Sequence, residues 1–301
     1  MTVTILGNNS ALPAYDRHPT AQLVSVWGND ILLDCGEGTQ MQMSRYGVRW
    51  RRLSHIFISH LHGDHYFGLP GLLNSMSLLG RTSPLTLWGP PALETVIDGI
   101  RAASGGWELS YPLEFHPLPE GAATLVDTPY FSVNCFPVEH RIACHGFLVE
   151  RKTRGRKLLP DKAREAGIPA FFWDRLKNGK DYVHDDGRIT PADSVTTDGP
   201  VPKRYAYCAD TRYTLSFLEH IRDADLLYHE STFLEADAAK AAERYHSTAR
   251  QAAEIAKAAG VKALLLGHYS SRYRDLEPFR AEAAEVFPHV QATIEGAAYE
   301  V

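Results

Sequence analysis

The sequence lacks any apolar run that approaches the roughly 20 residues needed for a membrane-spanning helix. Its four cysteines are widely spaced and include no C-x-x-C pair, which argues against a disulfide framework and a structural zinc knuckle. Residues 2–6 enter a strand-like alternation directly, without the basic region and apolar stretch of a signal peptide. These absences predict a cytoplasmic protein that does not use a membrane.

Positive charge is also scarce, with 31 Lys and Arg against 36 Asp and Glu and a formal net charge of −5. Because phosphate contacts favour basic surfaces, the net charge taken alone argues against a nucleic-acid-binding protein. The charge is unevenly distributed, however. Ten Lys or Arg lie between residues 151 and 180, opposed there by three acidic residues. We predict that residues 151–202 form a basic excursion from the core of a single domain that spans residues 1–301.

Short strand-like runs alternate with helical patterns along most of the chain. The strand-like runs are residues 31–33, 56–58, 205–207, 226–228 and 262–266. The helical patterns cover residues 69–79, 92–103 and 236–259. Strands both early and late in the chain, with helices between them, predict a mixed α/β fold in which two sheets are sandwiched between helices.

Histidine is abundant, with 14 residues, and one cluster of it carries the strongest chemical signal. The run Ser59-His60-Leu61-His62-Gly63-Asp64-His65 directly follows a strand-like segment. His60 and His62 are two residues apart, so both side chains point to one side of an extended backbone. Gly63 allows a sharp turn, after which Asp64 and His65 can reach a second, adjacent metal. Imidazoles and a carboxylate suit Zn²⁺, with Mn²⁺ or Fe²⁺ as alternatives.

Two metals need about seven protein ligands, so others must come from distant segments. His140, Asp210 and His268 each follow a strand-like run, and strand ends are where ligands tend to be presented. His246 lies between two helical halves, in His-Ser-Thr. Taken singly, each of these residues also fits an ordinary cap or a position in a solvated turn. Their joint occurrence with the histidine run favours a dinuclear site.

The histidine run with later single His, Asp and His residues resembles the metallo-β-lactamase superfamily. Further motifs resemble the ribonuclease Z family, and the resemblance covers essentially the whole chain. These motifs are Asp34-Cys-Gly-Glu-Gly-Thr-Gln40, Ala209-Asp210-Thr211, His246-Ser-Thr248 and Gly267-His268. The resemblance implies a four-layer αββα sandwich with a protruding arm, holding two Zn²⁺ per chain.

The resemblance also assigns the site residues. One zinc would be held by His60, His62 and His140, the other by Asp64, His65 and His268, and Asp210 would bridge them. Asp64 would in addition accept the proton of the attacking water, and His246 would stabilise charge or protonate the leaving oxygen. Glu230 would orient His246, although a simple helix-start carboxylate is an equal alternative for it. Asp34 would orient a ligand histidine.

The family resemblance implies a zinc-dependent endoribonuclease that removes the 3′ trailer from precursor tRNA. The basic arm would grip the tRNA elbow through phosphate contacts, and the chain would form a homodimer. Where the family's arm often carries Gly-Pro, this sequence has Gly167-Ile-Pro-Ala-Phe-Phe-Trp173.

Two alternatives stay open at this stage. The first is a small-molecule hydrolase of the same fold, acting on phosphodiesters, thioesters or lactones. The second is a non-enzymatic tRNA-binding protein with a decayed site, although every expected ligand is present.

Overall fold

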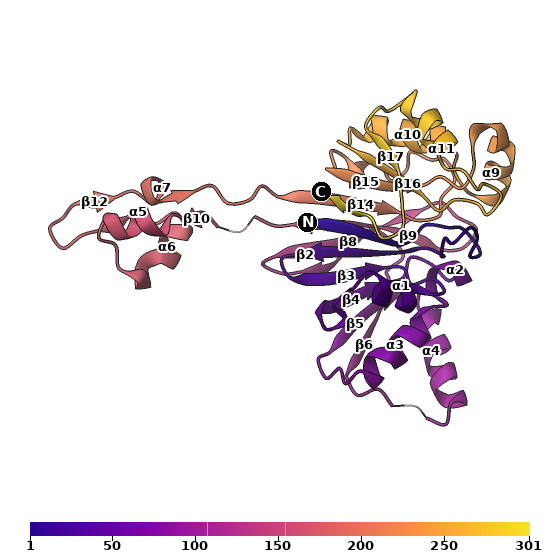
Figure 1. The fold of residues 1–301 in the computed structure, drawn as a ribbon, viewed down its shortest axis with the longest axis horizontal. Coiled ribbons are helices and arrows are strands. Elements are labelled where there is room, and N and C mark those ends of the chain that lie inside the picture. The colour runs from indigo at the N-terminus through magenta and orange to yellow at the C-terminus, as the bar shows by residue number, and fades with distance from the viewer. Residues whose placement is uncertain (107, 154) are drawn as a thin grey trace. The chain divides into compact units, whose positions relative to one another are not determined.

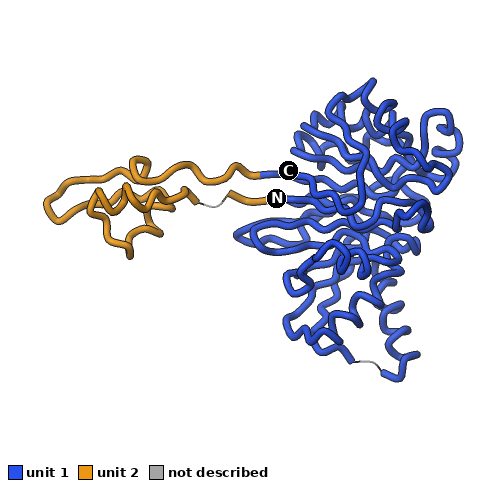
Figure 2. Tube along the Cα trace, viewed as in Figure 1, with its two compact units in different colours: residues 1–150, 203–301 blue, residues 151–202 orange. Residues whose placement is uncertain are grey.

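The structure is a computed structural model that describes residues 1–106, 108–153 and 155–301. Trp107 and Arg154, the latter part of the basic run, lie outside the described residues. The chain divides into two compact units (Figure 2). Residues 1–150 and 203–301 form the first unit, which we call the body, and residues 151–202 form the second, which we call the arm.

The first sheet of the body is built mainly from the N-terminal half of the chain. Its strands, in spatial order, are β18 (Ala298–Glu300), β1 (Thr2–Gly7), β2 (Ala21–Val26), β3 (Asn29–Leu33), β4 (Leu53–Phe57), β5 (Leu85–Gly89) and β6 (Leu113–Pro117). Strands β18 to β3 pair antiparallel, whereas β3 to β6 pair parallel. The parallel half therefore presents several strand ends at one edge of the sheet.

The second sheet repeats this division into antiparallel and parallel parts. Its strands, in spatial order, are β17 (Val290–Ala292), β16 (Leu264–Gly267), β15 (Leu226–Glu230), β14 (Lys203–Cys208), β9 (Cys144–Arg151), β8 (Phe131–Val138) and β7 (Ala123–Asp127). Strands β14 to β17 pair parallel, and β7 pairs antiparallel with β8. Residues 262–266 are the last strand-like run that the sequence predicts, but two short strands follow them, and β18 returns to pair with β1.

Helices cover the outer face of each sheet, as Figure 1 shows for α3 and α4 on one side and α10 and α11 on the other. The helices beside the first sheet are α1 (Thr39–Arg45), η1 (Trp50–Arg52), α2 (Gly63–Tyr66), α3 (Leu69–Leu78) and α4 (Ala92–Ala103). Those beside the second are α8 (Leu218–Ile221), η3 (Glu235–Asp237), α9 (Ala238–Arg244), α10 (Ala249–Ala259) and α11 (Glu277–Ala284). The prediction of two sheets sandwiched between helices is confirmed.

Alternation along the strands explains the layering. In β3, Ile31 and Leu33 join the core between the two sheets, whereas Leu32 joins the core beneath the helices of the first sheet. In β4, Phe57 joins the core between the two sheets and Ile56 joins the core beneath the helices. Both faces of these strands are buried, which is why their sequences are continuous apolar runs instead of polar–apolar alternation.

Helix α10 has the sequence signals expected for its two ends. The Thr248 side chain accepts a hydrogen bond from the Gln251 amide, and the Gln251 side chain accepts one from the Thr248 amide, which makes a capping box. Gly260 ends the helix at a φ of 68°, in the left-handed region that glycine tolerates best. The cap fixes the chain direction immediately after His246.

The arm has a small apolar core of its own. Its elements are β10 (Lys157–Leu158), α5 (Pro160–Glu165), η2 (Ala170–Phe172), α6 (Trp173–Lys177), β11 (Tyr182–Val183), β12 (Ile189–Thr190), α7 (Ala192–Val195) and β13 (Thr196–Thr197). Ile168, Leu176 and Val195 are buried together in this core. Several basic side chains of the arm pair locally, including Arg164 with Asp161. In the described residues no helix combines the length and apolar character required to span a membrane.

Candidate metal centre

The site lies where parallel strands of both sheets end. His60 follows β4, Asp210 follows β14 and His268 follows β16. Carboxyl ends of parallel strands gather at one edge, and open α/β sheets characteristically place their ligands there. The two sheets therefore bring together residues more than 200 positions apart in sequence, such as His65 and His268.

Three histidines form the first group of potential metal ligands. His62 Nδ1 lies 3.1 Å from Nε2 of His60 and 3.1 Å from Nε2 of His140. The His60 and His140 side chains are fully buried, and His62 is half-buried. Burial is the largest cause that lowers the pKa of His62 and of His140, each to about 4. Both rings are therefore neutral at neutral pH and keep a lone pair for a metal.

Asp64, His65 and His268 form the second group. His268 Nε2 lies 3.3 Å from His65 Nε2 and 3.3 Å from Asp64 Oδ2. Burial raises the pKa of Asp64, but the neighbouring His65 and His268 outweigh it and hold the pKa below its usual value. Asp64 is therefore a carboxylate in this site.

Asp210 stands between the two groups and offers one oxygen to each. Its Oδ2 lies 3.6 Å from His60 Nε2 and 3.7 Å from His140 Nε2. Its Oδ1 lies 3.2 Å from His65 Nε2 and 3.1 Å from His268 Nε2. The side chain is almost fully buried, which is costly for a carboxylate unless cations surround it.

Asp34 fixes the proton of His65. Its Oδ2 accepts hydrogen bonds from His65 Nδ1 at 2.8 Å, from the Ser59 hydroxyl at 2.9 Å and from the Tyr207 phenol at 2.5 Å. Because a carboxylate only accepts, the His65 proton resides on Nδ1 and its Nε2 carries the lone pair. This is the orienting contact that histidine ligands of metals usually make.

His140 and His268 are oriented in the same way. His140 Nδ1 donates to the Tyr245 carbonyl at 2.9 Å. The Thr232 hydroxyl donates to Glu230 at 2.7 Å, so at 2.9 Å it accepts the Nδ1 proton of His268. In both rings the lone pair is on Nε2, the atom that faces the cluster.

The donor set fits divalent metal ions. Ring nitrogens of five histidines approach one another to within 3.1–3.3 Å, with carboxylate oxygens among them. Within the described part of the chain, Asp210 Oδ1 receives no hydrogen bond although it is buried. Burial lowers the pKa of His65, yet the carboxylates of Asp210, Asp64 and Asp34 together raise it well above its usual value. The pocket thus favours positive charge at its centre, and imidazole with carboxylate is a typical zinc donor set.

Two residues of the site adopt backbone conformations that side chains rarely accept. Asp34 has a φ of 57° and His268 a φ of 59°. The left-handed region costs a non-glycine residue of the order of 1–3 kcal/mol, and such residues cluster at functional sites. The surrounding hydrogen bonds hold both side chains toward the cluster at this cost.

His246 and Glu230 form a buried pair beside the cluster. His246 Nδ1 donates to Glu230 Oε1 at 2.8 Å. Burial lowers the pKa of His246, but the Glu230 carboxylate outweighs this effect and the pKa rises to about 9. Glu230 is the last residue of β15, so the alternative of a helix-start carboxylate is wrong. His246 also lies close enough to Asp210 and His268 to complete a third group of potential ligands.

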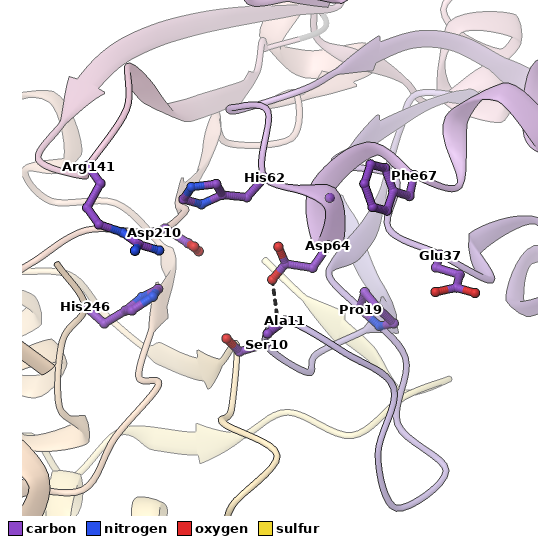
Figure 3. A pocket seen from close by; sticks show the side chains of 11 residues that line it. Ser10, Ala11, Pro19, Glu37, His62, Asp64, Phe67, Arg141, Asp210 and His246 are labelled. Carbon is purple, nitrogen blue, oxygen red and sulfur yellow. Dashed lines mark hydrogen bonds between the residues drawn. The ribbon is translucent and has the colours of Figure 1, made fainter. Parts of the chain in front are cut away.

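A pocket of about 330 Å³ opens onto the cluster. It is lined by Ser10, Ala11, Pro19, Glu37, His62, Gly63, Asp64, Phe67, Arg141, Asp210 and His246 (Figure 3). The sequence did not single out Arg141, Phe67 or Ala11, although the first follows His140 and the second lies two positions after His65. The Ala11 amide donates to Asp64 Oδ2 at 2.7 Å, and no side-chain pattern encodes such a backbone contact.

Comparison with known proteins agrees with this geometry. Residues 1–150 match the family described as Anti-Pycsar protein Apyc1. The chain is similar in fold to YhfI of Bacillus subtilis, a metallo-β-lactamase fold protein, with a TM-score of 0.69 and 20% identity over 99% of this chain and 98% of that one. The two helix-covered sheets and the histidine–aspartate cluster thus define a divalent-metal protein of the metallo-β-lactamase fold.

More similar relatives give the family within this fold. The ribonuclease Z of Parabacteroides distasonis is 42% identical over 95% of this chain and 94% of the relative. Human tRNase Z, short form, has a TM-score of 0.72 and 27% identity, and the match covers 100% of this chain and 99% of that one. The chain belongs to the ribonuclease Z family.

Proposed function

We propose that this chain is an endoribonuclease that cleaves precursor tRNA at its 3′ side. It removes the trailer, leaving a 3′-hydroxyl on the tRNA and a 5′-phosphate on the trailer. The observation that carries the proposal is the complete histidine–aspartate cluster at the floor of an open pocket, in a chain of the ribonuclease Z family.

We assign two Zn²⁺ ions to the two groups of side chains. The first group is His60, His62 and His140, the second is Asp64, His65 and His268, and Asp210 faces both. When bound, such a pair of cations makes water more acidic and offsets negative charge on a phosphodiester. The donor set also accepts Mn²⁺ or Fe²⁺, whose ligand preferences overlap with those of zinc.

Asp64 is positioned to accept the proton of the attacking water. Its carboxylate lines the pocket and is held in place by the Ala11 amide, the contact drawn in Figure 3. This backbone hydrogen bond restricts the rotation of the carboxylate. Asp64 thus combines a ligand position with a base position.

His246 is positioned to act on the leaving group. It lines the same pocket, and Glu230 orients its ring from behind so that Nε2 is available to the substrate. A protonated ring there can stabilise charge on the phosphodiester oxygens and donate a proton to the leaving 3′ oxygen. Positioned acid catalysis of this kind contributes about 10²–10⁴-fold to the rate.

Arg141 supplies a permanent positive charge to the pocket. It is exposed and lies at the His62 and His246 side, as Figure 3 shows. The other charged lining residues include the carboxylates of Glu37, Asp64 and Asp210, which repel an approaching phosphate. A guanidinium can bind two phosphate oxygens at once, so we assign Arg141 to the scissile phosphate or its neighbour.

We assign the arm to the binding of precursor tRNA and the body to the cleavage step. The arm has 11 Lys or Arg against 8 Asp or Glu, a formal charge of +3, whereas the body has 20 against 28, a charge of −8. This asymmetry supports an electrostatic role for the arm in binding a polyanion whose reaction occurs at an acidic body. A homodimeric state and a cytoplasmic location belong to the same proposal.

The test uses a precursor tRNA with a 3′ trailer and the purified, metal-loaded protein. We expect a single cut that leaves a tRNA 3′-hydroxyl, which can be extended by a polymerase, and a 5′-phosphate on the trailer. Hydrolysis of a small phosphodiester with no cleavage of any precursor tRNA would instead indicate the small-molecule hydrolase.

A further inference from the structure

Phe67 is a large apolar side chain that lines the catalytic pocket yet stays 62% exposed. The other lining side chains include three carboxylates, two histidines and one arginine, and all of these except Glu37 have a role in the proposed reaction. Single exposed apolar residues are common on protein surfaces and need no function. Phe67 differs from such residues in its place in the pocket and in the contacts that hold its ring.

The Phe67 ring is seated directly against backbone. A Cβ atom at Gly63 would lie only 2.2 Å from Phe67 Cε2 and 2.6 Å from Cζ, so the ring occupies the space that any other residue at position 63 would fill. Gly63 stands between His62 and Asp64, so the ring lies against the turn that carries both. The ring of Tyr66 packs on it at a centroid distance of 5.0 Å.

The backbone on both sides of Phe67 is fixed as well. The Phe67 amide donates to the Gly63 carbonyl at 2.9 Å, and the Gly68 amide donates to the Cys35 carbonyl at 3.0 Å. Gly68 is packed so closely that a Cβ there would lie 2.1 Å from the Gly36 carbonyl oxygen. The exposed ring is thus held rigidly, and little conformational entropy is lost when a ligand packs on it.

A flat, rigid aromatic surface beside a phosphodiester site suits a nucleobase. Base–aromatic stacking is the usual way that proteins hold single-stranded RNA, and it tolerates every base because each has a π face. The position of the ring also selects the side of the cut. In Figure 3, Phe67 lies across the pocket from His246, with Asp64 between them.

We propose that Phe67 stacks on the base of the first trailer nucleotide, the one that carries the new 5′-phosphate after cleavage. This rests on the proposed function, in which His246 acts at the leaving 3′ oxygen and therefore marks the tRNA side. The opposite end of the pocket then receives the trailer. Because stacking does not read base edges, the contact holds the trailer without selecting its sequence.

The first test is a cycle of protein and substrate changes measured by single-turnover kcat/KM. With an intact precursor, Phe67→Ala should lower kcat/KM by about 5- to 100-fold, the range expected for one stacked base. With a precursor that is abasic at the first trailer position, the kcat/KM values of wild type and Phe67→Ala should agree within about twofold. Phe67→Trp should retain activity, and Leu78→Ala, which removes an exposed apolar side chain outside the pocket, should act like wild type.

An equal loss in Phe67→Ala on the intact and abasic precursors would overturn the proposal, because the ring would then act only through the fold or the neighbouring ligands. Coupling to an abasic site at the last retained tRNA nucleotide would overturn the assignment to the trailer side. Metal content and circular dichroism of each variant identify a folding defect, and Phe67→Leu, which keeps apolar volume without a π face, should then show the loss.

A second readout separates this inference from the proposed function. A precursor with 2-aminopurine at the first trailer position should lose fluorescence on binding to wild type and to Phe67→Trp, and should not lose it on binding to Phe67→Ala. If the wild type quenches the probe through Phe67 but cuts no precursor, the proposed function fails while the stacking contact stands. Equal quenching by Phe67→Ala in a protein that cuts normally would overturn the stacking contact alone.

Discussion

Glu230 Oε1 lies 2.8 Å from His246 Nδ1, and the Glu230 carboxylate accepts three further hydrogen bonds. The Thr211 amide shares Oε1, and the Thr232 amide and hydroxyl bind Oε2. Glu230 is fully buried at the end of β15, and these donors, His246 and the nearby His268 stabilise its negative charge. The pair connects the second sheet to the loop before α10.

Glu230→Gln tests this arrangement. The new amide NH₂ group faces hydrogen-bond donors that the carboxylate oxygen accepted from, so buried polar groups are left without partners. The free energy of unfolding should therefore fall by about 1–3 kcal/mol. With the His246 ring no longer held, kcat should fall by about 10- to 100-fold. Thermal unfolding and single-turnover cleavage measure the two effects. Glu282→Gln is the control, since Glu282 also accepts backbone hydrogen bonds, from Glu235 and Arg250, but lies outside the pocket.

His246→Ala separates catalysis from metal binding. We expect the variant to keep two metals, its fold and its affinity for precursor tRNA, while kcat falls by about 10²–10⁴-fold. Metal content has to be measured together with the rate, because His246 lies near Asp210 and His268 and could bind a metal with them. Loss of one metal from the variant would make His246 a ligand, and a near-normal rate would remove it from the mechanism.

Arg141→Ala tests the positive charge in the pocket. Hydrogen bonds to a charged group are worth about 1.5–3 kcal/mol, so kcat/KM for precursor tRNA should fall by about 10- to 100-fold. Arg141→Lys should recover part of the loss, because it keeps the charge but not the bidentate geometry. Arg244→Ala, an exposed arginine at the end of α9, serves as the control. A normal rate for Arg141→Ala would show that the guanidinium does not contact the phosphate.

Replacing the arm tests its role in binding. Residues 152–202 should be exchanged as a whole for a short Gly-Ser linker, because a partial deletion would split the apolar core that Leu176 shares with Val195. β9 and β14, which flank the arm, are neighbours in the sheet, so a short linker can join them.

We expect KM for precursor tRNA to rise and hydrolysis of bis(p-nitrophenyl) phosphate to stay nearly unchanged. The logarithmic salt slope of tRNA binding should flatten by about 0.7–0.9 for each lost phosphate contact. An unchanged KM and salt slope would mean that the basic run is only a solvated surface.

Much of the site was predictable because its residues belong to short local patterns. His60 to His65 lie in one run, and His140, Asp210 and His268 each follow a strand, so the parallel topology brings them together. The two sheets and most helices were predictable for the same reason, since both faces of the central strands are apolar.

What the sequence did not predict depends on contacts between distant segments. The Tyr207 phenol reaches Asp34 across the two sheets, and the His140 ring is oriented by the carbonyl of Tyr245, which any residue could supply. Strand β18 was missed because three residues that pair with β1 carry no strong periodicity. Phe67 was missed because an aromatic residue in a run of apolar residues looks like core until its exposure is known.

The most direct test of the central claim is the metal content and trailer release of Asp210→Ala beside the wild type. Asp210 is the residue whose two oxygens face both groups of ligands. We expect two metals per chain and a single 3′ cut in the wild type, and fewer metals with no detectable trailer release in the variant. An Asp210→Ala protein that keeps both metals and cuts precursor tRNA at the wild-type rate would contradict the dinuclear mechanism.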